Sequence, residues 1–272
     1  MEQIYYQAKP IAVKKKFVFS KDIDHFFVDV YDVYKFIILF FRGVFSPPFD
    51  RKEVIKQCYQ VGYKSVFLIS LTGFLTGIVF TKQSRPSLAE FGATSWLPSL
   101  IGIAIIRALA PLITSLICAG KVGSQIGAEI GSMKVTEQID AMEVSAANPF
   151  KFLVVTRVVA TTLMIPILTL YAGFVGMLGS FINVNENEQI SFTTFFQDAF
   201  TRISFLDIGG SIVKSIVMGF TIGIVGCYYG YRATRGTAGV GLAANSSVVV
   251  AMFLVFIEEI LIVQVINWLR PI

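Results

Sequence analysis

The chain has 272 residues, of which 54% are hydrophobic and only 15% are charged, and its mean hydropathy is +0.69. Soluble domains carry about 25% charged residues, so this composition excludes an ordinary water-soluble fold and indicates an all-α polytopic membrane protein. The net charge of +5 does not predict a nucleic-acid partner, because the lysines and arginines flank apolar runs and fix orientation in the membrane. The single histidine and the three cysteines have no metal-ligand spacing, so we expect neither a metal site nor a cofactor in this chain.

The N-terminal region precedes the first apolar stretch that is long enough to cross a bilayer. Residues 1–24 are polar and basic and are expected to form a cytoplasmic arm. Residues 25–60 are interpreted as an interfacial helix followed by an elbow. In that helix Val30, Tyr34, Ile37 and Phe41 share one face and the charged residues lie on the other, which is typical of a helix in the membrane interface.

A five-span membrane domain is predicted over residues 61–272. Each apolar stretch approaches or exceeds the roughly 20 residues that a helix needs to cross the hydrocarbon core. The predicted spans are 62–81, 97–119, 158–182, 208–231 and 242–269.

The distribution of charge between the loops predicts the orientation. The N-terminal arm and the loop 120–157 hold most of the lysine and arginine, whereas residues 183–207 are acidic. The positive-inside rule therefore predicts a multi-pass protein of the inner (cytoplasmic) membrane, with its N-terminus in the cytoplasm and its C-terminus in the periplasm. A short surface helix is predicted at 192–203 on the outer side.

The segment 120–157 is the longest charged interruption between two spans, and it must face water. Within it Val135, Ile139 and Met142 recur at helical spacing, which predicts a short amphipathic helix over 135–144 that Asn148 and Pro149 would end. A short helix on a loop between two spans can transmit motion from a soluble partner into the membrane.

No set of residues in the sequence is typical of an enzyme. Gly120 and Lys121 begin a GKVG stretch, but this stretch lacks the G-x-x-x-x-G-K-[ST] pattern of a phosphate-binding loop. We therefore expect no ATP hydrolysis by this chain. Any transport against a gradient must be driven by a partner.

Ionisable residues inside the predicted spans are candidate functional groups. Arg107 lies in mid-span, where a charge costs at least about 2.5–3.5 kcal/mol, so we expect it to face a polar cavity or to pair with an acid. A lipid headgroup phosphate is one candidate partner, since a guanidinium binds phosphate through two hydrogen bonds. Glu258 and Glu259 are candidate partners, but adjacent helical residues project about 100° apart, so a shared two-carboxylate site is not expected. Lys214 is expected to extend its ammonium group to the outer membrane surface.

Glycines repeat at helical spacing in three segments of the sequence. Such ridges allow helices to approach closely in lipid, either within one chain or at a dimer interface, and the sequence alone leaves both interpretations open. The ridges are Gly73 and Gly77; Gly123, Gly127 and Gly131; and Gly219, Gly223, Gly226 and Gly230.

The central block of the sequence resembles the MlaE (YrbE) permease family, the membrane subunits of MCE-type ABC lipid transporters. The resemblance rests on the segments AGKVG from Ala119, AEIG from Ala128, MKVTEQIDAMEV from Met133, and Asn148-Pro149. Weaker similarity extends through Arg157 and Pro166 to the GTAGVG segment. The sequence departs from some bacterial members after Arg107, because Ala108 stands where they have a glutamate that could pair with the arginine.

The resemblance implies a homodimer with two cytoplasmic ABC ATPase subunits, an MCE-domain protein on the outer side and a bound phospholipid. ATP and Mg would be bound by the ATPase partners. Arg107 is the candidate lipid-binding residue. The residues implied to couple to the ATPase are Glu129, Met133, Thr136, Glu137, Ile139, Asp140, Met142 and Glu143.

We therefore expect the permease subunit of an ATP-driven lipid transporter. An ion- or proton-coupled secondary transporter using Arg107, Glu258 and Glu259 is the first alternative. A non-transporting membrane scaffold for an ATPase is the second.

Overall fold

The computed structural model describes residues 21–46, 50–234 and 236–269, and in this part of the chain every regular element is a helix. The predicted all-α class is therefore confirmed. The predicted N-terminal arm lies outside the described residues up to residue 20. The elements are α1 (Lys21–Val44), α2 (Arg51–Cys58), η1 (Tyr59–Tyr63), α3 (Lys64–Glu90), η2 (Thr94–Trp96), α4 (Leu97–Ala104), η3 (Ile105–Leu109), α5 (Ala110–Cys118), η4 (Ala119–Gly123), α6 (Ser124–Val135), α7 (Gln138–Val144), η5 (Phe150–Val155), α8 (Thr156–Glu188), α9 (Phe192–Thr201), α10 (Phe205–Tyr231) and α11 (Thr237–Leu269).

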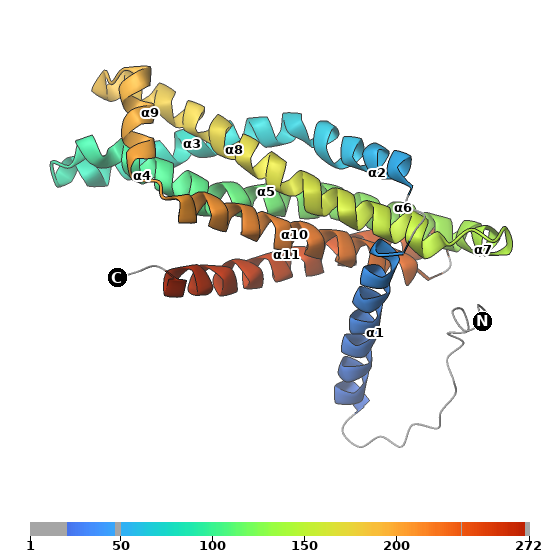
Figure 1. Cartoon of the computed structure of the whole chain (residues 1–272). Coiled ribbons are helices and arrows are strands. Elements are labelled where there is room, and N and C mark those ends of the chain that lie inside the picture. Colours follow the sequence, from blue (N-terminus) through green and yellow to red (C-terminus); the bar gives the residue numbers. More distant parts are fainter. Residues whose placement is uncertain (1–20, 47–49, 235, 270–272) are drawn as a thin grey trace.

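Five long helical stretches of the described residues are apolar enough to cross a membrane. They run side by side, with α7 at one end of the bundle and α9 at the other (Figure 1). Four of the five predicted spans lie within one of them, and the fifth, 242–269, ends one residue beyond the last stretch. The stretches are Arg51–Glu90, Thr94–Val135, Phe150–Glu188, Phe205–Tyr231 and Thr237–Trp268.

Most of these stretches extend beyond the apolar segment that predicted them. The largest difference concerns the predicted loop 120–157, because the helix of the second span continues through η4 and α6 to Val135. Charged residues mark where a chain leaves hydrocarbon, but the helix itself continues for as long as it can pack on neighbours. Here Gly127 lies against Ser247 of α11, and Gly131 lies against Ala233 and Ala243.

The predicted interfacial helix is present as α1, which runs across the axis of the bundle (Figure 1). Its aromatic contacts with the bundle include those of Phe36 and Phe40, whose rings pack edge to face against Phe150, Tyr228 and Phe220. Asp29 and Asp32 also form ion pairs with Arg232. Val30, Tyr34 and Phe41, which belong to the predicted apolar face, are exposed. One stripe of α1 therefore packs on the bundle, and Val30 and Tyr34 lie on an exposed apolar stripe, while Phe41 also stacks on Phe220.

The glycine ridges make close contacts within the chain. A Cβ atom on Gly77 would lie 1.9 Å from the carbonyl oxygen of Gly176, so α3 and α8 touch backbone to backbone there. Gly223 lies in the same way against Val158 of α8, and Gly230 lies against Ile130 of α6. Of the two interpretations left open by the sequence, these contacts support packing within one chain.

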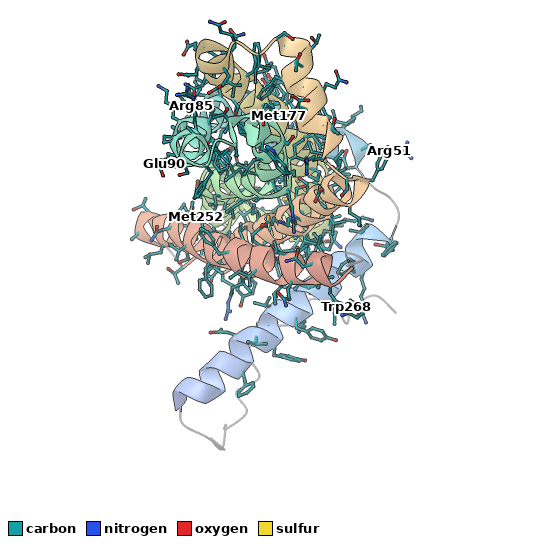
Figure 2. The ribbon with its side chains drawn as sticks, turned by 90° about the vertical axis from the view of Figure 1, so that its left-hand side faces the viewer. Arg51, Arg85, Glu90, Met177, Met252 and Trp268 are labelled. Atoms are coloured by element: carbon teal, nitrogen blue, oxygen red, sulfur yellow. The ribbon has the colours of Figure 1, made fainter. Side chains whose placement is uncertain are left out.

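The last helix, α11, is the least covered of the five. Only 11% of its most apolar window is buried, against 28–50% for the other four. It packs on α10 and α6, at the edge of the bundle from which α1 projects (Figures 1 and 2). An apolar surface containing Phe253, Phe256 and Ile260 is left exposed along it.

Candidate functional site

The short helix α7 lies at one end of the bundle and begins after a sharp turn (Figure 1). Glu137 adopts the left-handed conformation with φ of 59°, and this turn separates α7 from α6. The predicted helix over 135–144 is therefore present but starts later, because Val135 still belongs to α6. The ammonium group of Lys134 lies 2.9 Å from the carboxylate of Asp140 and holds α7 against α6.

The two faces of α7 have different environments. Ile139 is 1% exposed and belongs to the hydrophobic core, and Met142 packs against that core. These side chains attach α7 to the bundle. Glu137, Asp140, Glu143 and Thr136 are exposed, while Met133 is half-buried on α6. The exposed face also carries Val144, which is 90% exposed and was not singled out from the sequence.

Glu129 occupies a different position from the other predicted coupling residues. One of its carboxylate oxygens lies 3.2 Å from a guanidinium nitrogen of Arg157 at the start of α8. The other accepts a hydrogen bond of 2.8 Å from Gln125. Arg157 is buried, and it also donates to the backbone oxygen of Leu153. Glu129 therefore binds within the bundle rather than standing on the exposed face of α7.

The opposite half of the bundle contains a column of polar residues on α10. Asp207, Lys214 and Thr221 follow one another at intervals of two helical turns, so their side chains lie on one face of the helix. Each is bonded to a polar group of another helix. We call these three residues and their partners Arg107, Asn267, Glu259 and Glu258 the polar column.

Lys214 is the most deeply buried member of the polar column. Its side chain is 1% exposed and its ammonium group lies 2.5 Å from the carboxylate of Glu259, so the prediction that it reaches the outer surface is wrong. The ammonium group also donates a hydrogen bond of 3.0 Å to the backbone oxygen of Arg107. That oxygen lies in η3, a π-helical segment whose widened turn changes the hydrogen bonding along the second span.

Arg107 is bound to residues that the sequence did not suggest. Its guanidinium group donates a hydrogen bond of 2.6 Å to the amide oxygen of Asn267 and lies 3.9 Å from a carboxylate oxygen of Asp207. Its side chain is still 25% exposed. The predicted acidic partners Glu258 and Glu259 are bound to other residues.

The two adjacent acids bind different groups, as their positions on a helix predict. Glu259 binds Lys214, whereas Glu258 accepts a hydrogen bond from the hydroxyl of Thr221. The second carboxylate oxygen of each acid is buried and has no hydrogen-bond partner among the described residues. Each of these two carboxylate oxygens can therefore accept a further hydrogen bond.

Sequence reasoning missed Asp207, Asn267 and Thr221. Asp207 was counted as part of the acidic outer loop, although it is 4% exposed and also caps α10 through Ser204. The interval of seven residues from Asp207 to Lys214 and Thr221 is visible in the sequence and could have placed them on one face. The described residues contain no group of three or more potential metal ligands.

Comparison with known proteins assigns this architecture to a family. A family model described as Permease MlaE matches residues 54–265. The chain belongs to the MlaE permease family. It is therefore a multi-pass membrane protein and a permease subunit of an ABC transporter, as predicted, and this membership argues against an ion-coupled secondary transporter.

Individual relatives of this MlaE-family permease come from bacteria and from a plant. A probable ABC transporter permease protein of Rickettsia typhi is 32% identical over 87% of this chain and 91% of its own length. One from Synechocystis is 35% identical over 80% and 83% of the two chains. The Arabidopsis protein TRIGALACTOSYLDIACYLGLYCEROL 1, chloroplastic, is 33% identical over 76% of this chain and 59% of its own length.

Proposed function

We propose that this MlaE-family permease moves lipid, in particular phospholipid, between the inner membrane and an MCE-domain protein on the outer side. The observation that carries the proposal is the polar column, which lies in the half of the bundle opposite the exposed helix α7. A lipid transporter needs polar ligands for a headgroup within the hydrocarbon region, and ionisable groups are kept there at a cost because they serve a function.

The chemistry of the polar column suits a phosphate-bearing headgroup. The Arg107 guanidinium is partly exposed, and a guanidinium binds phosphate through two parallel hydrogen bonds. The carboxylate oxygens of Glu258 and Glu259 that have no partner among the described residues could accept hydrogen bonds from an amine or a hydroxyl of the headgroup. The name of the Arabidopsis relative contains that of a glycolipid, which supports a lipid cargo.

The energy is proposed to come from two separate cytoplasmic ABC ATPase subunits that bind ATP and Mg. Their docking surface would be the exposed face of α7, where Glu137, Asp140 and Glu143 surround Val144. A small apolar centre with a charged rim is the usual anatomy of a protein interface. This assignment also requires the proposed orientation, with α7 and the N-terminus in the cytoplasm and the C-terminus in the periplasm.

A second copy of the chain is proposed to pack on the exposed surface of α11. The polar column opens toward α11 through Arg107 and Asn267, so two copies related by a two-fold axis would enclose one polar chamber. A C2 dimer uses the same patch on both subunits. The lipid would then lie between the two permeases.

Purification of the complex from membranes, followed by lipid mass spectrometry, tests the proposal. We expect the ATPase, the MCE-domain protein and a phospholipid to co-purify with the permease. The purified complex in vesicles should also transfer a fluorescent phospholipid to the MCE-domain protein only when ATP and Mg are present. Transfer by the permease alone in a pH gradient, or ATP hydrolysis without lipid transfer, would overturn it.

A further inference from the structure

Four polar side chains form a continuous bridge across three spans near the α7 end of the bundle. Gln60 of η1 accepts a hydrogen bond of 2.9 Å from the side-chain nitrogen of Gln125 on α6. The same nitrogen donates to Glu129, which pairs with Arg157 at the start of α8. We call Gln60, Gln125, Glu129 and Arg157 the polar bridge, and it joins the first, second and third spans.

The bridge differs from the other contacts of α6. Toward α11 this helix packs through small residues, since a Cβ on Gly127 would lie 2.5 Å from the Ser247 hydroxyl oxygen, and toward α10 its apolar Ile130 lies against Gly230. Toward the first and third spans, long polar side chains make the connection. A displacement of α6 can therefore reach those spans through the polar bridge, and loss of its charges would interrupt that route.

Burial indicates that the bridge is more than a surface ion pair. The Arg157 side chain is 7% exposed, and its Nε atom has no hydrogen-bond partner among the described residues. A buried guanidinium needs its carboxylate, since an unpaired charge in a low-dielectric site is strongly unfavourable. The Glu129 side chain is itself 36% exposed, but the buried guanidinium of Arg157 holds its carboxylate, and α6 is held to α8 with it.

Three π-helical segments lie beside the bridge. Gln60 is within η1, Gln125 follows η4 by two residues, and Arg157 follows η5 by two residues. Single π-helical turns interrupt the regular α-helical bonding and are frequent at functional sites. Each span thus has a deformable turn next to the residue that links it to the others.

We infer that the polar bridge transmits the movement of α7 and α6 to the first and third spans, and that Glu129 is a positioning residue rather than a contact with the ATPase. This inference rests on the proposed function, because it requires an ATPase partner that moves α7. It deepens that proposal by naming the residues through which the movement reaches the spans.

The test uses the full complex in phospholipid vesicles, with the variants Glu129→Gln, Arg157→Gln and the double variant. We expect Glu129→Gln to lower ATP-dependent transfer of a fluorescent phospholipid by about tenfold, while the KM for ATP and the co-purification of the ATPase remain unchanged. Residues that act through one contact are not additive, so the double variant should lose no more than the worse single variant.

Arg85 and Glu188 provide the matched control. Their side chains form an ion pair of 2.9 Å between α3 and α8, but at the opposite end of the bundle. Arg85→Gln removes an ion pair of α8 without touching the polar bridge, so transfer should stay near the wild-type rate. An equal loss in this control would overturn the inference.

Spin labels give a readout that does not depend on the cargo. With Cys58 replaced by serine, labels are attached at the exposed positions Ser132 on α6 and Phe67 on α3. If the bridge couples α6 to α3, the distance between the two spin labels should stay nearly constant on ATP binding in the wild type. In Glu129→Gln the same distance should change. The same response in both would overturn the inference, even if lipid transfer is confirmed.

If the charge variants fail to fold, two uncharged positions of the bridge still allow the inference to be tested. Gln60→Ala and Gln125→Ala remove parts of the bridge without leaving a buried charge, and they should reduce transfer by a smaller factor. Wild-type transfer in both of these variants, or loss of ATPase binding in folded Glu129→Gln, would overturn the inference. A wild-type complex that moves no lipid but keeps the label response would instead refute the proposed cargo.

Discussion

The ammonium group of Lys214 lies 2.5 Å from the carboxylate of Glu259, and the lysine side chain is only 1% exposed. A charge pair of this kind is weak evidence for stability as such, because desolvation offsets much of the attraction. Removing one partner is different, because it leaves the other charge buried and unpaired. This asymmetry makes the pair suitable for a direct test.

Lys214→Met should lower the free energy of unfolding by about 3–5 kcal/mol, which is typical when one partner of a buried ion pair is lost. The double variant Lys214→Met with Glu259→Gln should recover most of that loss, because no unpaired charge remains. Thermal unfolding of the purified proteins in one detergent measures both effects. Equal stability of the single and double variants would contradict the structural pairing.

Gly77→Ala should destabilise the contact between α3 and α8. The added Cβ would lie 1.9 Å from the carbonyl oxygen of Gly176, so the helices must separate, and overpacking of this kind costs about 1–3 kcal/mol. Gly209→Ala is the matched control, since nothing lies within 4 Å of its Cβ position. Thermal unfolding should show a lower midpoint for the first variant and no loss for the second.

Charge reversal on α7, through Glu137→Lys together with Glu143→Lys, should abolish productive docking of the ATPase. Both side chains are exposed, so the fold should be retained while the charged rim changes sign. Pull-down of the ATPase and its stimulation by the permease are the measurements. Glu186→Lys, at the opposite end of the chain's third span, should leave both unchanged. Normal docking of the double variant would place the ATPase elsewhere.

Arg107→Gln should reduce the phospholipid retained during purification by at least about tenfold, because one charge-assisted hydrogen bond contributes about 1.5–3 kcal/mol. The partners Asn267 and Asp207 would remain in place. Lipid mass spectrometry on equal amounts of wild-type and variant complex gives the ratio. Unaltered retention together with unaltered transfer would show that Arg107 is a structural residue only.

Hydropathy was sufficient to predict the helical class and the core of every span. It did not predict where the helices end, because α6 continues beyond the apolar segment through packing of Gly127 and Gly131 on other helices. The short helix α7 was predicted from the spacing of Ile139 and Met142. Its start was misplaced because the left-handed turn at Glu137 has no strong sequence signal.

The polar column also shows a difference between what the sequence predicted and what only the packing of the helices decided. Single charges within spans were recognised as costly, but the partners of Arg107 and Lys214 come from residues more than 40 positions away in the chain. Sequence spacing along one helix cannot specify which face of another helix it meets. Lys214 was therefore expected at the membrane surface, although it lies buried beside Glu259.

The sequence by itself determined that this protein is a five-span membrane protein with a charged segment between its second and third spans, because the cost of placing charge in hydrocarbon is a local property of each residue. Its role as a permease followed from the resemblance to the MlaE family. Only the tertiary structure decided that Glu129 pairs with Arg157 inside the bundle and that Asp207, Lys214 and Thr221 line one polar column. Such pairings depend on how helices distant in sequence pack, and that packing is a property of the whole chain.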